Sequence, residues 1–310
     1  MVSNLINEAT RGVYPIAATP FAEDGSVDFD SIDSLVEFYV ECGVHGLTIL
    51  GMMGEAHKLS DAESLATIDR FMRRVDGRLP VVVGVSNPSV PGVADLSKAS
   101  MDKGCAGVMI TPATGLKTET QIFGYFESVF SALGPDIPVC FQDYPTSTGV
   151  YVSAETFLAL VEAHPSLVML KHEDFPALRK LTTIRRRGDS PAQRRISIFV
   201  ANAGLYYPLE MRRGADGVMT GFAFPDMLVE TYDLFMQGEA DAAEDLYDLY
   251  LPLLRYEYQT GFGLAIRKEI LHRRGAIKCV ATRQPGPAMN ADEHAELTML
   301  MDRLQRKLGD

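Results

Sequence analysis

The stretch that decides the fold is Glu41-Cys42-Gly43-Val44-His45-Gly46-Leu47-Thr48-Ile49, because its pattern recurs twice along the chain. The other two copies are Asp102-Lys103-Gly104-Cys105-Ala106-Gly107-Val108-Met109-Ile110 and Arg212-Arg213-Gly214-Ala215-Asp216-Gly217-Val218-Met219-Thr220. Each copy has a helical stretch, a glycine, two residues, a second glycine and an apolar strand. The first glycine suits the position just after a helix, where φ is positive, and the second allows a tight turn into the strand. Three such junctions predict a parallel sheet with alternating helices.

Eight apolar runs along the chain have the length and composition of strands. They are Val13–Thr19, Gly46–Leu50, Pro80–Gly84, Gly107–Thr111, Pro138–Asp143, Leu167–Lys171, Ile196–Val200 and Gly217–Thr220. Helical patterns lie between them at Ser31–Glu41, Asp61–Val75, Val93–Asp102, Thr120–Ala132, Ser153–Ala163, Phe175–Arg186 and Tyr206–Arg213. This alternation predicts an α/β protein, a (β/α)₈ TIM barrel. A doubly wound open sheet is the alternative, weakened because no GxGxxG follows the first strand.

The pattern after the eighth strand is helical only. Apolar residues recur at helical spacing in Asp226–Gln237, Ala240–Leu254, Gly263–Arg274 and Ala291–Leu308. This is more helix than one barrel unit needs. The sequence therefore predicts a barrel over residues 1–225 and a C-terminal helical region, packed on the barrel, over residues 226–310.

Composition limits the partners and the compartment. The net charge is −12 over 310 residues, which argues against a nucleic-acid or anionic-membrane partner, because both need a basic surface. The four cysteines are far apart and form no CxxC pair, a pattern typical of buried thiols in a reducing compartment. The N-terminus has no apolar signal core, and no run of about 18 apolar residues predicts a membrane span. We expect a cytoplasmic protein.

Lys171 is the most informative single residue. It ends the apolar run Leu167–Leu170 and precedes His172 and Glu173. A lysine at the end of a buried strand is costly unless it is paired or neutral. Burial favours the neutral amine, a nucleophile that can form a Schiff base with a ketone. The alternative is a structural ion pair with the carboxylates that follow it.

Other polar groups follow other strands, and in a barrel the active site lies at these carboxyl ends. Gly51-Met52-Met53-Gly54-Glu55 follows the second strand. Its backbone N–H groups can form a nest for a carboxylate, although an ordinary turn braced by Glu55 fits equally. Met219 and Thr220 end the eighth strand, and we expect them to line the substrate site.

The fifth strand ends in Gln142-Asp143-Tyr144-Pro145. Alternation sends Gln142 and Tyr144 to one face of the strand and Asp143 to the other. Tyr144 is a candidate proton relay beside Lys171, or a tyrosine hydrogen-bonded at the rim. The histidines show no metal-ligand spacing. The sequence predicts neither a metal nor a cofactor.

The order of these motifs resembles the dihydrodipicolinate synthase and N-acetylneuraminate lyase family. Thr19-Pro20-Phe21 comes first, then the Gly51–Glu55 motif, then Pro145-x-x-Thr148-Gly149, then the strand-six lysine. The resemblance covers essentially the whole chain. It implies a class I aldolase on a (β/α)₈ barrel, usually tetrameric, in which Lys171 matches the Schiff-base lysine. It also implies that the backbone of Met52 and Met53, which replace a Thr or Ser pair, binds the substrate carboxylate.

Three departures from the family pattern bear on the substrate. Gln142 stands where the family usually has its strand-five tyrosine, Ser147 replaces the arginine that binds the second substrate of true synthases, and Ala113-Thr114 replaces a tyrosine pair. The Gln-Asp-x-Pro turn with Lys-x-Glu on strand six is similar to the branch that includes 2-keto-3-deoxy-L-arabonate dehydratase.

This resemblance leads to a prediction of activity with alternatives. We expect a Schiff-base-forming lyase that acts on a 2-oxo acid, by dehydration of a 2-keto-3-deoxy sugar acid. Glu173 is the candidate acid–base group, or a simple ion-pair partner of Lys171. The alternatives are a pyruvate-dependent aldolase or 4-hydroxy-tetrahydrodipicolinate synthase, and an inactive barrel that binds a 2-oxo acid. The resemblance also implies a homo-oligomer, a tetramer or a dimer.

Overall fold

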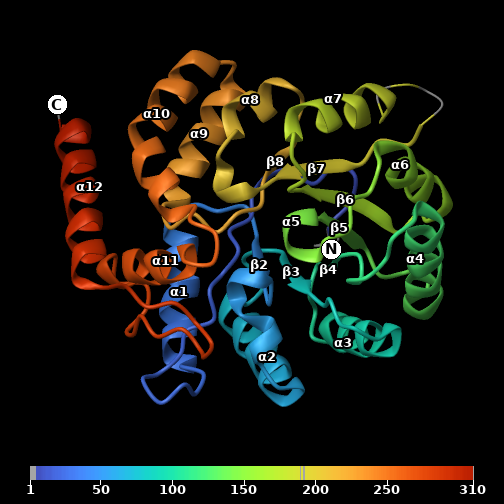
Figure 1. Cartoon of the computed structure of the whole chain (residues 1–310), viewed down its shortest axis with the longest axis horizontal. Helices are drawn as coiled ribbons and strands as arrows, with labels where there is room; N and C mark the ends of the chain where they lie inside the picture. Colours follow the sequence, from blue (N-terminus) through green and yellow to red (C-terminus); the bar gives the residue numbers. More distant parts are fainter. Residues whose placement is uncertain (1–4, 189, 191–192, 310) are drawn as a thin grey trace.

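The computed structural model describes residues 5–188, 190 and 193–309, and its centre is a parallel sheet of eight strands (Figure 1). The strands are β1 (Gly12–Val13), β2 (Leu47–Ile49), β3 (Val81–Gly84), β4 (Gly107–Ile110), β5 (Val139–Asp143), β6 (Leu167–His172), β7 (Ser197–Val200) and β8 (Gly217–Val218). Their spatial order is β1-β8-β7-β6-β5-β4-β3-β2. Each strand from β3 to β8 therefore lies beside its predecessor in the chain, and β1 and β2 are the two ends of the sheet, as in a barrel that closes between them.

Backbone hydrogen bonds close this sheet into a barrel. Residues after β1 pair with β8, where the Tyr14 N–H donates to the Val218 carbonyl at 2.9 Å. The same segment pairs with β2 through a parallel bridge between Ile16 and Thr48. The Thr48 N–H donates to the Pro15 carbonyl at 2.9 Å. The fold is the TIM barrel that the sequence predicts.

Helices connect the strands on the outside of the barrel. They are α1 (Phe29–Glu41), α2 (Asp61–Val75), α3 (Val90–Asp102), α4 (Glu119–Leu133), α5 (Pro145–Thr148), α6 (Ala154–Ala163), α7 (Ala177–Gly188) and α8 (Tyr207–Arg212), with short 3₁₀ helices η1 (Met52–Gly54), η2 (Ala56–Lys58) and η3 (Asn202–Gly204). Several begin at the side-chain caps that their sequences offer. Ser60 and Glu63 form a reciprocal capping box at α2, and Thr118 and Gln121 form one at α4.

The C-terminal helices are α9 (Pro225–Gln237), α10 (Ala240–Glu257), α11 (Gly263–Arg273) and α12 (Ala291–Gly309). Figure 1 shows them together at one side of the barrel, with α12 at the left edge of the view. Helix α9 contacts β1. The division at residue 226 stays a prediction. None of the helices within the described ranges is long and apolar enough to cross a membrane.

The predicted first strand is too long. The regular strand β1 ends at Val13, whereas the prediction extends to Thr19. Pro15 interrupts the ladder because it has no N–H to donate. The backbone nevertheless continues in the same direction, since the Ala17 N–H donates to the Thr48 carbonyl at 2.9 Å.

The glycines of the three repeats have two separate roles. Gly43, Gly104 and Gly214 have φ of +73°, +85° and +88°, the conformation expected after a helix. The second glycines are needed for close packing. At Gly217, a Cβ would lie 2.0 Å from the carbonyl oxygen of Gly12 on the neighbouring strand. Only glycine therefore permits this approach of β8 to β1.

Two apolar layers follow from the alternation of side chains along the strands. The larger layer fills the space between the sheet and the surrounding helices. The smaller one, called here the interior cluster, fills the inside of the barrel. It consists of Ile6, Tyr14, Ile16, Val82, Ala106, Met109, Cys140, Val168, Met169, Phe199 and Met219, with Met53 packed against it. The barrel is therefore solid below its mouth, and any chemistry must occur above this cluster.

Candidate active site

Lys171 lies inside the barrel near the carboxyl end of β6. Its side chain is 2% exposed, and Nζ lies 2.6 Å from Oε1 of Glu173. The same carboxylate oxygen accepts a hydrogen bond of 2.7 Å from Nε2 of Gln142. Gln142 is the register partner of Lys171 on β5. The structure thus brings together three of the predicted site residues, Lys171, Glu173 and Gln142.

Alternation along β5 and β6 explains this arrangement. Lys171 and Glu173 are two residues apart and face the same side, and Cys140, two residues before Gln142, belongs to the interior cluster. Burial raises the pKa of the Cys140 thiol to about 12, although the nearby Lys171 opposes the shift. The thiol is therefore neutral, and among the residues that the structure describes Glu173 is the carboxylate in direct contact with the Lys171 amine.

The outward-facing residues of β5 and β6 form a separate buried network. His172 Nδ1 lies 3.4 Å from Oδ2 of Asp143, and Lys180 Nζ lies 2.6 Å from the same oxygen. Burial alone would lower the pKa of His172, but the hydrogen bond and charge of Asp143 outweigh it, and the net shift is upward. His172 thus contacts Asp143 and, through Nε2, the Ala177 carbonyl at 2.9 Å, and it belongs to this network rather than to the Lys171 contact.

Tyr144 follows β5 and is half-buried. Burial, and next the charge of Glu173, raise the pKa of its hydroxyl to about 12. The hydroxyl therefore stays protonated at neutral pH, in a position to donate a proton or a hydrogen bond. The charge of Glu173 acts on the Tyr144 hydroxyl, and the role of Tyr144 as a relay stays a prediction.

The predicted carboxylate-binding loop forms the short helix η1. Met52 is 45% exposed, whereas Met53 packs against the interior cluster. Ser147 on α5 lies across the mouth from this loop, with Oγ 4.0 Å from the Met52 sulfur. The first backbone N–H groups of a helix have no acceptor within that helix. The N–H groups of Met52 and Met53, at the start of η1, therefore remain without an acceptor inside η1.

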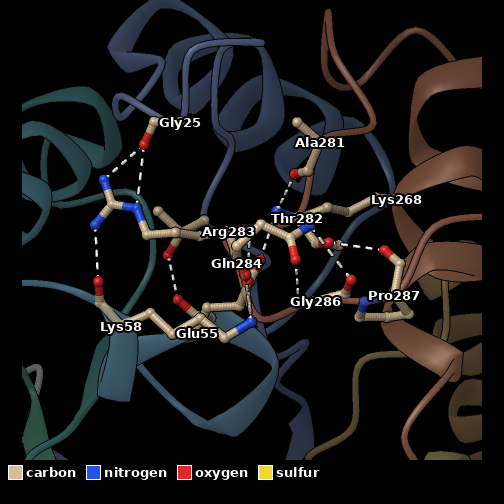
Figure 2. Close-up of polar contacts among 12 residues, drawn as sticks. Gly25, Glu55, Lys58, Lys268, Ala281, Thr282, Arg283, Gln284, Gly286 and Pro287 are labelled. Carbon is tan, nitrogen blue, oxygen red and sulfur yellow. Dashed lines mark hydrogen bonds and ion pairs between the residues drawn. The ribbon is translucent and has the colours of Figure 1, made fainter.

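Glu55 braces this loop from behind, as one of the two sequence interpretations expected. Its side chain is fully buried, with Oε1 2.8 Å from Lys268 Nζ and Oε2 2.8 Å from Lys58 Nζ. The Arg283 N–H also donates to Oε2 at 3.0 Å (Figure 2). Both oxygens face cations of the protein, so the Glu55 carboxylate has a structural role. It ties the loop after β2 to α11 and to the segment that follows α11.

The end of β8 supplies the last two predicted site residues. Met219 is fully buried in the interior cluster, and Thr220 is 3% exposed. The Thr220 carbonyl accepts a hydrogen bond of 2.9 Å from the Ile16 N–H. Met219 therefore closes the floor of the site, and contact of either residue with substrate stays a prediction.

The C-terminal helices bring polar residues to the mouth that the sequence patterns did not indicate. The Tyr258 hydroxyl donates to Oδ1 of Asn202 at 3.3 Å, and Asn202 adopts a left-handed backbone with φ of 53°. The charges of Tyr258 and Arg267 both act on the pKa of Tyr144. Helical periodicity marked α10 and α11 only as packing elements, so it carried no signal for these side chains.

Within the described ranges, no group of three His, Cys, Asp or Glu side chains could hold a metal ion.

Comparison with known proteins places the chain in a family. The model of the Dihydrodipicolinate synthetase family matches residues 9–304. The chain belongs to this family. The family's members are lyases of the class I aldolase superfamily, and this chain is such a lyase.

Individual relatives cover most of the chain. An L-2-keto-3-deoxyarabonate dehydratase from Azospirillum brasilense is 30% identical over 298 residues, which are 95% of this chain and 94% of the relative. A 4-hydroxy-tetrahydrodipicolinate synthase from Sorangium cellulosum is 33% identical over 211 residues, 67% of each chain. The crystal structure of dihydrodipicolinate synthase from Rhodopseudomonas palustris is 43% identical, with a TM-score of 0.94 over 96% of this chain and 99% of that one.

Proposed function

We propose that this lyase dehydrates a 2-keto-3-deoxy sugar acid through a Schiff base on Lys171. The observation that carries the proposal is the buried contact of 2.6 Å between Lys171 Nζ and Glu173 Oε1. The contact joins a nucleophile to a proton acceptor inside the barrel. Similarity to the Azospirillum dehydratase over nearly the whole of both chains supports this branch of the family.

The first step would join substrate and enzyme. The carboxylate at C1 would accept hydrogen bonds from the backbone of Met52 and Met53, as the resemblance implies. Lys171 Nζ would attack the ketone carbon C2, and loss of one water would leave an imine. Glu173 would take the proton that the ammonium must lose before it can attack.

The second step would be the elimination. The imine nitrogen draws electrons from C3, so a C3–H proton becomes acidic enough for a carboxylate such as Glu173 to remove. The hydroxyl on C4 then leaves as water after it receives a proton, and the Tyr144 hydroxyl is our candidate donor. Water finally hydrolyses the conjugated imine and releases Lys171. The net change is the loss of one water from the sugar acid.

Ser147 favours this reaction over the synthase reaction. A substrate with a second carboxylate needs a cationic partner, and a bidentate arginine is the strong solution. Ser147 offers a neutral hydroxyl on the exposed side of α5. A polyhydroxyl tail suits such a group, because each hydroxyl can donate and accept a hydrogen bond.

Imine trapping tests the proposal. Incubation with pyruvate, reduction with borohydride and intact-mass measurement should show an adduct that peptide mapping places on Lys171. Lys171→Ala should abolish both the adduct and the dehydration of 2-keto-3-deoxy-L-arabonate. Lys180→Ala is the matched control, because Lys180 belongs to the outward-facing network and should leave the trapping site unchanged. An adduct that persists in Lys171→Ala would refute the assignment of the nucleophile.

The substrate is tested separately with a panel of sugar acids. Release of water from a 2-keto-3-deoxy sugar acid supports the proposal, whereas cleavage to pyruvate and an aldehyde would indicate an aldolase. A protein that traps pyruvate but transforms no sugar acid would contradict the proposed reaction while leaving the Schiff base in place. Absence of trapping by the wild-type chain would favour the third interpretation, an inactive 2-oxo-acid-binding barrel.

A further inference from the structure

Arg267 on α11 is a buried arginine with one donor group left over. Its side chain is 5% exposed. Nε and Nη2 both donate to Oε1 of Glu257, at 2.9 and 2.6 Å, and the other oxygen of Glu257 accepts the Ala223 N–H at 3.0 Å. Nη1 is buried and has no hydrogen-bond acceptor among the residues that the structure describes. A buried donor without an acceptor is costly, so this one calls for an explanation.

The free donor lies at the end of β8. A Cβ built on Gly221 would lie 2.0 Å from Nη1 of Arg267 and 2.4 Å from its Cζ. The guanidinium therefore occupies the space that any other side chain at position 221 would fill. Met219, two residues earlier, belongs to the interior cluster, and alternation places position 221 on the same face. Nη1 thus lies against the backbone at position 221, two residues beyond Met219 at the carboxyl end of the barrel.

Electrostatics connects this donor to the reacting residues. The charge of Arg267 acts on the hydroxyl of Tyr144, where it opposes the upward pKa shift that burial and Glu173 cause. Arg267 and Glu173 thus act on the same hydroxyl in opposite directions, although they come from α11 and from the end of β6. A contact between Arg267 and a substrate would therefore lie on the side of the mouth where β8 ends.

Charge balance indicates what Nη1 would bind. Glu257 already pairs with the guanidinium through a bidentate contact to one oxygen, so the Arg267–Glu257 pair has no net charge to offer an anion. Lys171 and Glu173 likewise neutralise each other. A second carboxylate on the substrate would meet no unmatched cation in this cluster, whereas a neutral hydroxyl oxygen needs only one N–H donor.

We infer that Arg267 Nη1 donates a hydrogen bond to a hydroxyl oxygen on the substrate tail, beyond C3. This makes Arg267 a specificity-determining residue that selects polyhydroxylated 2-oxo acids over pyruvate, which has no tail. The inference rests on the proposed function, because it assumes a sugar-acid substrate. Gly221 contributes to the same selectivity, since only glycine at this position leaves room for the Arg267 guanidinium.

Two variants test the inference. Arg267→Lys keeps a cation beside Glu257 but removes the planar fork and its outer donor. Gly221→Ala keeps the Arg267–Glu257 charges and pushes the guanidinium away from β8. The matched control is Arg273→Lys on the same helix, whose partner is Glu269 at 2.6 Å. Circular dichroism and thermal melting establish that each variant is folded.

Two measurements distinguish an effect on binding of the substrate tail from an effect on imine formation. The first is kcat/KM for dehydration of 2-keto-3-deoxy-L-arabonate. The second is the pyruvate concentration that gives half-maximal borohydride trapping. Loss of one hydrogen bond to a charged donor corresponds to at least about a tenfold change. We expect Arg267→Lys and Gly221→Ala each to lower the ratio of sugar-acid kcat/KM to pyruvate affinity at least about tenfold, and Arg273→Lys to leave it within about threefold.

The results that would overturn the role of Arg267 differ from the results that would overturn the proposed dehydration. An equal loss of both readouts in Arg267→Lys would make Arg267 a structural residue, and no loss in either would exclude the contact. If Arg267→Lys does not fold, Gly221→Ala alone decides, since it retains both charged groups of the Arg267–Glu257 pair. A wild-type chain that traps pyruvate but dehydrates no sugar acid would overturn the proposed function, and with it this inference, before any variant is made.

Discussion

Glu210 on α8 offers a sharp test of the electrostatics behind the catalytic strand. The residue is 2% exposed. Burial raises the pKa of its carboxyl from 4.5 to about 7, and the nearby His172 only partly opposes this shift. His172 immediately follows Lys171 on β6. The perturbation that we consider is Glu210→Gln, which keeps the size of the side chain and removes its titration.

The sign and size of the effect follow from the two pKa values. A carboxyl whose pKa is raised by folding stabilises the fold in its protonated form. The contribution is complete below pH 4.5 and is lost as the pH rises to about 7. Because a tenfold change in proton affinity corresponds to about 1.36 kcal/mol, wild type should lose about 2.5 kcal/mol between pH 5 and pH 8 through this group. For 310 residues at about 2.1 cal/mol/K per residue, that is about 4 °C in Tm.

Thermal melting of wild type and Glu210→Gln at pH 5 and pH 8 measures this effect. The variant can differ from wild type by a constant amount, because glutamine adds donors that need partners. The prediction concerns the change of that difference with pH, which should favour the variant by about 4 °C more at pH 8 than at pH 5. Glu230→Gln, at an exposed carboxyl on α9, is the control and should show no such change. A difference that is the same at both pH values for Glu210→Gln would refute the argument.

Three further predictions concern the site and its support. Tyr144→Phe should lower kcat about 100-fold, the usual scale for one acid–base group, and a steady-state kcat within about threefold of wild type would make Tyr144 a rim residue. Lys268→Met should lower the free energy of unfolding by about 3 kcal/mol, because it leaves the buried Glu55 carboxylate without one of its two ammonium partners; an unchanged denaturation midpoint would contradict this. The wild-type chain should not condense pyruvate with aspartate semialdehyde, because Ser147 cannot bind a second carboxylate as arginine does; turnover near ~10 s⁻¹ in an assay coupled to dihydrodipicolinate reductase would overturn that prediction.

The fold could be predicted because three helix-to-strand junctions repeat with the same glycines. Gly43, Gly104 and Gly214 each required positive φ, and that requirement is visible in a single sequence. The limits of the strands were less visible. β1 is regular only over Gly12–Val13, because Pro15 lacks an N–H, while hydrogen bonds from separate residues still close the barrel. The periodicity of apolar residues indicates which side chains are buried. It does not indicate which backbone groups form the hydrogen bonds between strands.

Period-two alternation could predict which of the candidate site residues share a face. Lys171, Glu173 and Gln142 lie on one face of adjacent strands, and register brings them within 2.6 to 2.7 Å. Arg267 and Tyr258 could not be found in this way, because helical spacing predicts which face of α11 or α10 is buried and says nothing about the barrel strand that it meets. Gly221 was an available signal for Arg267 in the sequence. It could not be interpreted there, because the residue that it makes room for lies 46 positions later and meets it only in the folded chain.

Arg267 and Lys268 connect helix α11 to two different segments at the mouth of the barrel. These neighbours on α11 point to opposite sides, one to Gly221 at the end of β8 and the other to Glu55 in the loop after β2. Both are buried in full ion pairs, so a change in either carries a cost in stability as well as in binding. In the proposed reaction the strands hold the amine and its proton acceptor, whereas α11 braces the loop after β2 through Lys268 and carries the donor that we propose for the substrate tail. On this proposal, residues outside the barrel strands would set the choice of substrate, while the strands would supply the imine chemistry.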